Sequence, residues 1–302
     1  MKISKNKNGK LCQIIQGSIL NTSFLCYYLI GDIMKQNEVK EEKYKLYKTV
    51  REILHPSISK KNISNYKIIL KEELLPIKVY YPKKVSNINS AIIYVHGYSK
   101  INEEEGYSKI LSTMAKELDK MIISIDYNED DLLDKQIESI SKLYNHLYSG
   151  LKTNGIESEN ILIMGDSTGS TLIINIVNSG LIENIKEMKL LLFYPAIIDN
   201  NINHSPIDYE VITKLNKYYQ KIINKKVITA NDILKYGINE MYFPSTTIIC
   251  GNVDSLLEPI KKIKEKSNNI DLKLISFASH NFLYSKDKEI KKEYIKIISS
   301  IL

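Results

Sequence analysis

Residues 161–169 read ILIMGDSTG: an apolar run typical of a buried strand, followed at once by a Gly-x-Ser-x-Gly turn. Residues 168–179 then have a helical pattern that Gly180 ends. A strand-to-helix turn this sharp strains its central residue, and Gly165 and Gly169 remove side chains that would collide there. The turn therefore raises the Ser167 hydroxyl above the carboxyl end of the strand, where open α/β sheets bind their ligands.

The rest of the chain after residue 60 repeats this alternation of strand and helix. Short apolar runs rich in β-branched residues are separated by longer segments with apolar residues at helical spacing. Runs buried on both faces and alternating with helices predict an α/β fold, with a mainly parallel eight-stranded sheet and helices on both faces. The expected strands are residues 65–71, 77–81, 91–95, 121–126, 161–164, 189–193, 246–250 and 271–277.

Two segments do not follow the alternation, residues 1–60 and about 199–244. We expect one catalytic domain over residues 61–302, covered by an N-terminal helical cap segment, residues 1–60, and by a cap insertion at about 199–244. Residues 11–31 are uncharged and follow a basic run, as in a signal peptide or membrane anchor. Polar residues interrupt that stretch, so amphipathic helices are favoured and an anchor is the alternative.

Composition excludes several classes of function. Lys and Arg total 42 and Asp and Glu 35, a net charge of +7, but only Arg51 is an arginine and the lysines are interleaved with Glu. This matches the bias of an AT-rich coding sequence rather than a phosphate-binding surface, so we expect no nucleic-acid partner. The three cysteines form no C-x-x-C pair, which predicts a reducing, cytoplasmic location and no cysteine metal site.

A serine hydroxyl needs a base, and the base needs an orienting acid. In strand–elbow–helix hydrolases the chain order is Ser, then Asp or Glu, then His. His280 lies in a loop after the last expected strand, and Asp254 follows the strand before it. We therefore predict Ser167, Asp254 and His280 as a catalytic triad. Asp199, which follows the preceding strand, is the alternative acid.

Acyl transfer also needs backbone N–H groups aimed at the developing oxyanion. One donor should be Thr168, the residue after the nucleophile. The other should come from the loop after the third strand, where Gly97 allows close approach and either Tyr98 or Ser99 completes the pair. We interpret His96 as a structural residue that ties this loop down, because it precedes Ser167 in the chain.

Six short motifs resemble those of one known family, the α/β-hydrolase esterases related to hormone-sensitive lipase, over about residues 60–300. The resemblance implies hydrolysis of carboxylic esters without cofactor or metal, and a cap made from the N-terminus and from an insertion after the sixth strand. The motifs are Val95-His96-Gly97, Ile125-Asp126-Tyr127, Gly165-Asp166-Ser167, Tyr194-Pro195, Gly251 with Asp254, and Ser279-His280.

The chain departs from that family at three places. Gly97-Tyr98-Ser99 stands where three glycines are usual, and this change concerns the oxyanion hole and the acyl pocket. Thr168 and Ser170 stand where Ala and Gly are common, and Tyr127-Asn128-Glu129-Asp130 lacks the usual Pro-containing continuation.

The sequence thus predicts a serine carboxylesterase that forms an acyl-enzyme on small, soluble, short-acyl esters and needs no cofactor. A thioesterase, amidase or peptidase with the same triad is an alternative, and a non-catalytic binding protein on a hydrolase fold is an alternative of another class. We expect no membrane association, and the sequence carries no signal for an oligomeric state.

Overall fold

The structure is a computed structural model that describes residues 3–5, 11–13, 41, 45, 47–56, 63–70, 73–85, 88–99, 104–198, 208–236 and 241–302. The chain divides into two units, residues 1–45 and 46–302. In the first unit, β1 (Ile3–Lys5) pairs antiparallel with β2 (Leu11–Gln13). The expected helical stretch 11–31 therefore opens with a strand, and residues 14–31 lie outside the described part of the chain.

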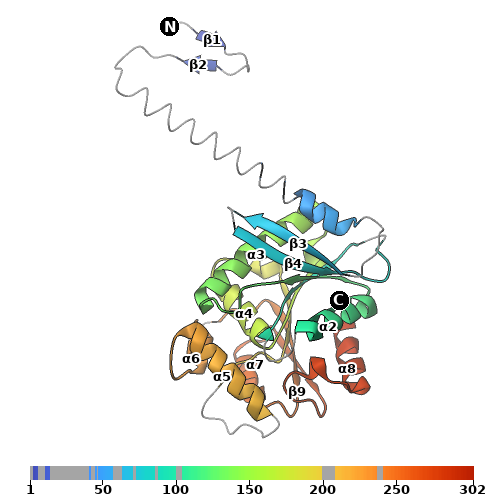
Figure 1. The fold of residues 1–302 in the computed structure, drawn as a ribbon, viewed down its shortest axis with the longest axis vertical. Coiled ribbons are helices and arrows are strands. Elements are labelled where there is room, and N and C mark those ends of the chain that lie inside the picture. The colour runs from blue at the N-terminus through green and yellow to red at the C-terminus, as the bar shows by residue number, and fades with distance from the viewer. Residues whose placement is uncertain are drawn as a thin grey trace. The chain divides into compact units, whose positions relative to one another are not determined.

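The second unit is built on an eight-stranded sheet with the order β10-β9-β8-β7-β5-β6-β4-β3 (Figure 1). The pairs β3–β4 and β4–β6 are antiparallel and all the others are parallel. This confirms the mainly parallel sheet. The strands are β3 (Ile63–Leu70), β4 (Glu73–Tyr80), β5 (Ala91–Val95), β6 (Met121–Ile125), β7 (Ile161–Asp166), β8 (Lys189–Phe193), β9 (Ser245–Gly251) and β10 (Ile270–Ile275).

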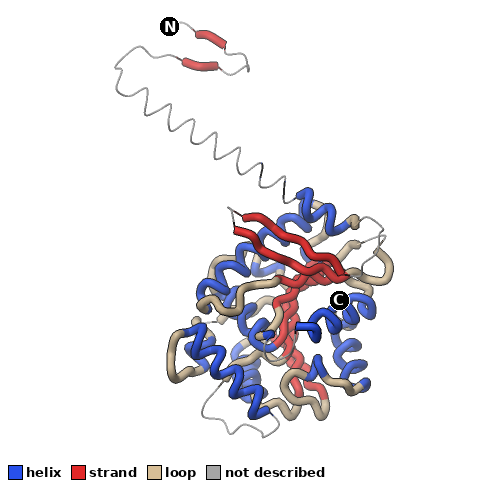
Figure 2. The backbone as a smooth tube through the Cα atoms, in the orientation of Figure 1, coloured by secondary structure: helices blue, strands red, loops and turns tan. Residues whose placement is uncertain are grey.

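Helices cover both faces of the sheet (Figure 2). The chain crosses from β5 to β6 in one direction and from β6 to β7 in the other, so right-handed crossovers put α2 and α3 on opposite faces. Helix α8 contacts α2, and α4 contacts α3. The helices are α2 (Glu104–Leu118), α3 (Leu133–Thr153), α4 (Ser167–Asn178), α5 (Tyr209–Ile223), α6 (Ala230–Ile233), α7 (Leu257–Lys266) and α8 (Lys288–Ser299).

The core lies along the central strands. Every residue of β5, β6 and β7 is buried, as their continuous apolar runs predict for strands covered on both faces. All parallel strands therefore end at one edge, and the loops that leave them there hold Ser167, Asp254 and His280.

The insertion after β8 is helical where the structure describes it. Helix α5 turns an apolar stripe inward, with Leu215, Tyr218, Tyr219 and Ile222 buried, and Thr229 and Asp232 form a capping box on α6. Residues 199–207 and 237–240 of the expected insertion lie outside the described residues, as does most of segment 1–60, although residues 47–54 are helical. Among the described residues, none of the helices is long and apolar enough to cross a membrane.

Candidate active site

The turn between β7 and α4 has the geometry that its glycines predict. Ser167 has a φ of +48°, a left-handed conformation that is rare for a residue with a side chain. A Cβ at Gly169 would collide with the Val95 carbonyl, and one at Gly165 would lie 2.8 Å from the same oxygen. Only glycine therefore fits on either side of the serine, and the strained turn presents Ser167 at the first turn of α4.

The structure brings the three predicted triad residues together. Ser167 Oγ lies 3.0 Å from His280 Nε2, and His280 Nδ1 lies 3.0 Å from Asp254 Oδ2. The Ser167 residue is 3% exposed, and the side chains of His280 and Asp254 are completely buried. This arrangement can move a proton from the serine to the imidazole while the carboxylate fixes the ring.

The acid is held by its own loop. Asp254 Oδ1 accepts a hydrogen bond from the Leu256 N–H at 2.8 Å, and the Cys250 thiol donates to Oδ2 at 3.4 Å. A Cβ at Gly251 would collide with the carbonyl of Ala278, so glycine there lets the acid loop approach the histidine loop. Burial, together with the negative charge of Asp254, raises the pKa of the Cys250 thiol, so the thiol keeps its proton as a donor.

A second buried carboxylate comes from the insertion. Asp208, which precedes α5, is 1% exposed and accepts a hydrogen bond from the Ser255 N–H at 2.9 Å. It therefore fixes the residue next to Asp254. Asp199, the alternative acid, lies outside the described residues.

The charge state of His280 reflects two opposing effects. Burial favours the neutral ring, but the charge and hydrogen bond of Asp254 outweigh it, so the pKa of His280 is raised above its ordinary value of 6.5. An imidazole that gains a proton beside a carboxylate suits a general base that must become an imidazolium during reaction.

The loop of residues 96–99, which we call the oxyanion loop, is tied down at each backbone N–H after His96. Gly97 N–H donates to Asp166 Oδ1 at 2.9 Å, Tyr98 N–H to Thr168 Oγ1 at 2.7 Å, and Ser99 N–H to Glu129 Oε1 at 2.8 Å. The two expected alternative donors of this loop, Tyr98 and Ser99, therefore both donate their N–H to side-chain oxygens, and the Gly97 N–H is bound to Asp166.

A family model described as an alpha/beta hydrolase fold matches residues 92–283, more than half of the chain. The chain belongs to the alpha/beta hydrolase fold family. The matched stretch contains the oxyanion loop, the elbow and the loops of Asp254 and His280. The resemblance drawn from the motifs is confirmed for this fold. No curated protein sequence matches the chain.

Solved structures of similar fold include several esterases. The Francisella virulence factor BioJ is 18% identical with a TM-score of 0.63, covering 87% of this chain and 95% of its own. EstE1, a thermophilic carboxylesterase from a metagenomic library, is 17% identical with a TM-score of 0.62, covering 87% and 96%. An esterase from the bacterial hormone-sensitive lipase family is 14% identical with a TM-score of 0.60, covering 86% and 96%.

In this α/β-hydrolase, a buried carboxylate lies beneath the oxyanion loop. Asp166 is fully buried and accepts hydrogen bonds from the hydroxyls of Tyr94 at 2.6 Å and Tyr107 at 3.0 Å, besides the Gly97 N–H. Burial raises the pKa of Asp166, while these donors act to lower it. The sequence indicates no role for Asp166, because the residues that donate hydrogen bonds to it lie 59 to 72 positions away.

A second residue whose place in the site was not predicted packs against His280. Tyr194 has a φ of +36° and sets its ring edge-on against His280, with centroids 4.9 Å apart. Tyr194 follows β8 and precedes Pro195, and this Tyr-Pro pair is the sequence feature that marks the position. The ring of Tyr194 therefore packs against the imidazole of His280 as a fixed aromatic surface.

His96 lies where the sequence analysis placed it, in the oxyanion loop. Its Nδ1 is 2.8 Å from the Gly97 carbonyl, and its ring stacks on Tyr127 with centroids 4.7 Å apart. Within the described residues, no cluster of three His, Cys, Asp or Glu side chains could hold a metal ion.

Proposed function

We propose that this hydrolase cleaves carboxylic esters through a covalent acyl-enzyme on Ser167. The observation that carries the proposal is the buried chain of hydrogen bonds Ser167–His280–Asp254 at a strained elbow. A hydroxyl in this setting has both the base and the orienting acid that nucleophilic catalysis requires.

The reaction would proceed in two halves. Ser167 Oγ attacks the acyl carbon as His280 Nε2 takes the hydroxyl proton, and the imidazolium then protonates the leaving alcohol as the ester C–O bond breaks. Water enters, loses a proton to His280 and attacks the acyl-enzyme, and the proton returns to Ser167 as the acid departs. Asp254 keeps the proton of Nδ1 in place and stabilises the imidazolium.

For the oxyanion we propose the N–H of Thr168 and that of Tyr98. Thr168 lies in the first turn of α4, whose N–H groups have no acceptor within the helix. A negatively charged oxygen is a stronger acceptor than a neutral hydroxyl, so it would displace Thr168 Oγ1 from the Tyr98 N–H. The Gly97 N–H is not available to the oxyanion, because it anchors the loop on Asp166.

We infer that the insertion forms part of a cap over the site. Tyr218 of α5 stacks on Tyr98 with ring centroids 4.2 Å apart, and the Tyr219 hydroxyl donates to the Ala196 carbonyl at 2.7 Å. The helical cap therefore rests directly on the oxyanion loop. We keep residues 1–60 as a proposed second part of the cap, and the cytoplasmic location as a prediction.

Labelling with a fluorophosphonate tests whether Ser167 is an activated nucleophile. We expect the intact chain to gain the mass of one phosphonyl group, with loss of fluoride, and Ser167→Ala to gain none. Ser149→Ala, an exposed serine on α3, is the matched control and should label like the wild type. A wild-type chain that is folded but unlabelled would favour the non-catalytic binding protein. Rates on matched ester, thioester and amide substrates then rank the remaining alternatives.

A further inference from the structure

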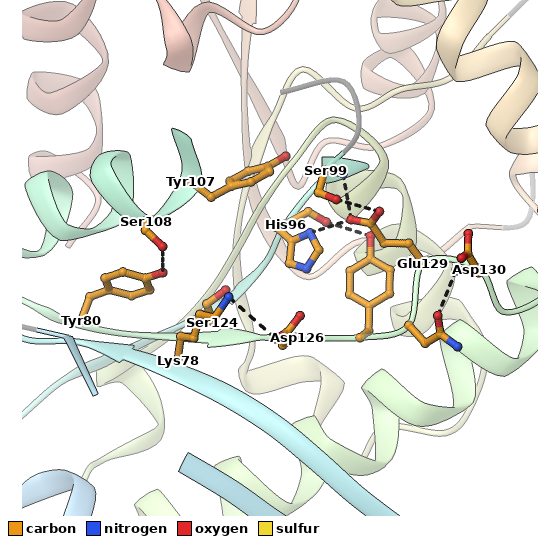
Figure 3. A pocket seen from close by; sticks show the side chains of 12 residues that line it. Lys78, Tyr80, His96, Ser99, Tyr107, Ser108, Ser124, Asp126, Glu129 and Asp130 are labelled. Atoms are coloured by element: carbon orange, nitrogen blue, oxygen red, sulfur yellow. Dashed lines mark hydrogen bonds and ion pairs between the residues drawn. The ribbon is translucent and has the colours of Figure 1, made fainter. Parts of the chain in front are cut away.

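A polar cavity of about 250 Å³ lies beside the oxyanion loop, with His96 and Ser99 in its lining. Its walls are β4, the carboxyl ends of β5 and β6, the loop after β6 and the first turns of α2 (Figure 3). None of Ser167, His280 and Asp254 lines it. The volume is below the range of about 300–1,000 Å³ typical of drug-sized ligands, so the cavity suits a smaller molecule.

One wall of the cavity is the ring of His96. His96 Nδ1 faces two acceptors, the Gly97 carbonyl at 2.8 Å and Glu129 Oε1 at 3.4 Å. Nδ1 is therefore the donor to the protein, and the other ring nitrogen, Nε2, is left for a ligand. In Figure 3 this second nitrogen lies on the side of the ring that faces Lys78 and Asp126.

One lysine and three carboxylates line the cavity, and two of the carboxylates, Glu129 and Asp130, already have partners. Both carboxylate oxygens of Glu129 accept hydrogen bonds from Ser99, one from its N–H at 2.8 Å and one from its hydroxyl at 2.9 Å. Asp130 is paired with Lys221 at 2.7 Å. Lys78 and Asp126 face each other more loosely, at 3.8 Å, with side chains 41% and 43% exposed. A phosphate would meet one lysine among three carboxylates, so an anion is disfavoured. The loosely paired Lys78 and Asp126, which together carry no net charge, are left to face a neutral ligand.

The remaining polar groups of the wall are mixed donors and acceptors. The hydroxyls of Tyr80 and Ser108 lie 3.2 Å apart, and either can donate to the other, which leaves one proton for a ligand. Ser124 adds a further hydroxyl, and the rings of Tyr107 and Tyr127 supply apolar surface. Closely spaced hydroxyl, amino and carboxylate groups beside aromatic rings complement a molecule with several hydroxyls on a carbon frame.

We propose that this cavity binds a neutral polyol of monosaccharide size. Each ligand hydroxyl both donates and accepts hydrogen bonds. The hydroxyls of one polyol can therefore bond to Asp126, Lys78, His96 Nε2 and the Tyr80–Ser108 pair. The site stands apart from Ser167, and the proposal does not depend on ester hydrolysis.

Titration calorimetry with the full chain tests the proposal, with D-xylose, D-glucose and glycerol as probes and with sodium phosphate and ethylammonium chloride as ionic competitors. We expect a pyranose to bind with a Kd of about 1–10 mM, because small polar ligands gain little free energy per atom. Asp126→Asn and Ser108→Ala should each weaken it by about fivefold or more, the loss of one hydrogen bond. Asp271→Asn, an exposed carboxylate on β10 paired with Lys273, is the matched control and should change nothing.

Asp126 and Ser108 make no contact with the triad, so hydrolysis of p-nitrophenyl acetate by both variants should equal that of the wild type and shows that they fold. The proposal is overturned if no pyranose binds at about 100 mM. It is equally overturned if phosphate or ethylammonium binds more tightly than every sugar, or if the two cavity variants bind sugar as the wild type does.

Discussion

The proposed chemistry rests on Ser167 and His280, and on the one carboxylate that lies against the histidine. Asp254 lies against Nδ1 of His280 and is itself held by the Leu256 N–H. Its removal would leave the imidazole free to turn or to take the wrong tautomer. The alternative acid, Asp199, lies outside the described residues.

Asp254→Asn should lower kcat for p-nitrophenyl acetate by about 10⁴-fold, because the wrong tautomer blocks proton transfer. Asp199→Asn should stay within about tenfold of the wild type, below 1.4 kcal/mol of barrier. Steady-state rates of both variants at one pH distinguish the two acids. A severe loss in Asp199→Asn with an active Asp254→Asn would contradict the assignment.

The raised pKa of His280 predicts a pH dependence. The base acts only when neutral, so kcat/KM should rise with pH and level off above a pKa that is higher than 6.5. The nearby charge of Asp254 holds that pKa up, so in Asp254→Asn the remaining activity should reach its plateau at lower pH. A pH profile of kcat/KM measures both, and an unmoved midpoint in the variant would show that Asp254 does not face the base.

At the scale of elements, the oxyanion loop depends on the loop after β6. Glu129→Ala removes the carboxylate that accepts hydrogen bonds from the N–H and hydroxyl of Ser99 and that lies beside His96. The substitution should lower the unfolding free energy by about 1–3 kcal/mol. kcat/KM should fall by about tenfold or more, because the N–H of Tyr98 is then poorly placed. Denaturant unfolding and initial rates measure the two effects.

Two variants control this experiment. Glu129→Gln keeps one acceptor oxygen and should recover part of both losses. Glu138→Ala removes an exposed carboxylate paired with Lys142 on α3 and should change stability by less than about 0.5 kcal/mol. Equal effects of the alanine variants at Glu129 and Glu138 would show that the loop is not held by Glu129.

The sequence defines these elements best where burial is continuous. Strands 91–95 and 189–193 are predicted to the residue: the first is an apolar run between Ser90 and His96, and the second is the short run Lys189–Phe193. The β3–β4 hairpin is predicted with shorter strands and a longer turn, because residues 72–75 carry no clear alternation. Ser167, Asp254 and His280 are predicted as a group from the elbow and chain order, and the structure places them within hydrogen-bond distance of one another. Asp166, Glu129, Asp208 and Tyr194 could not be predicted, since their roles arise from partners distant in sequence.

At the scale of the molecule, the proposed cap formed by the insertion should decide which substrates enter. Its described part packs an apolar stripe inward and exposes lysines, so it offers no broad apolar surface for lipid. We expect short acyl chains to react fastest in a series of p-nitrophenyl esters of increasing length. A sharp rise in rate where a long-chain ester exceeds its solubility would instead indicate a lipase.

The hydrolysis of p-nitrophenyl acetate by wild type and Ser167→Ala tests the central claim most directly. The elbow geometry does not depend on the serine hydroxyl, so the variant should fold with unchanged thermal stability to within a few degrees. We predict that its kcat falls by about 10³-fold or more, because triad members act as a unit. A folded variant that turns over at nearly the wild-type rate would contradict a nucleophilic role for Ser167.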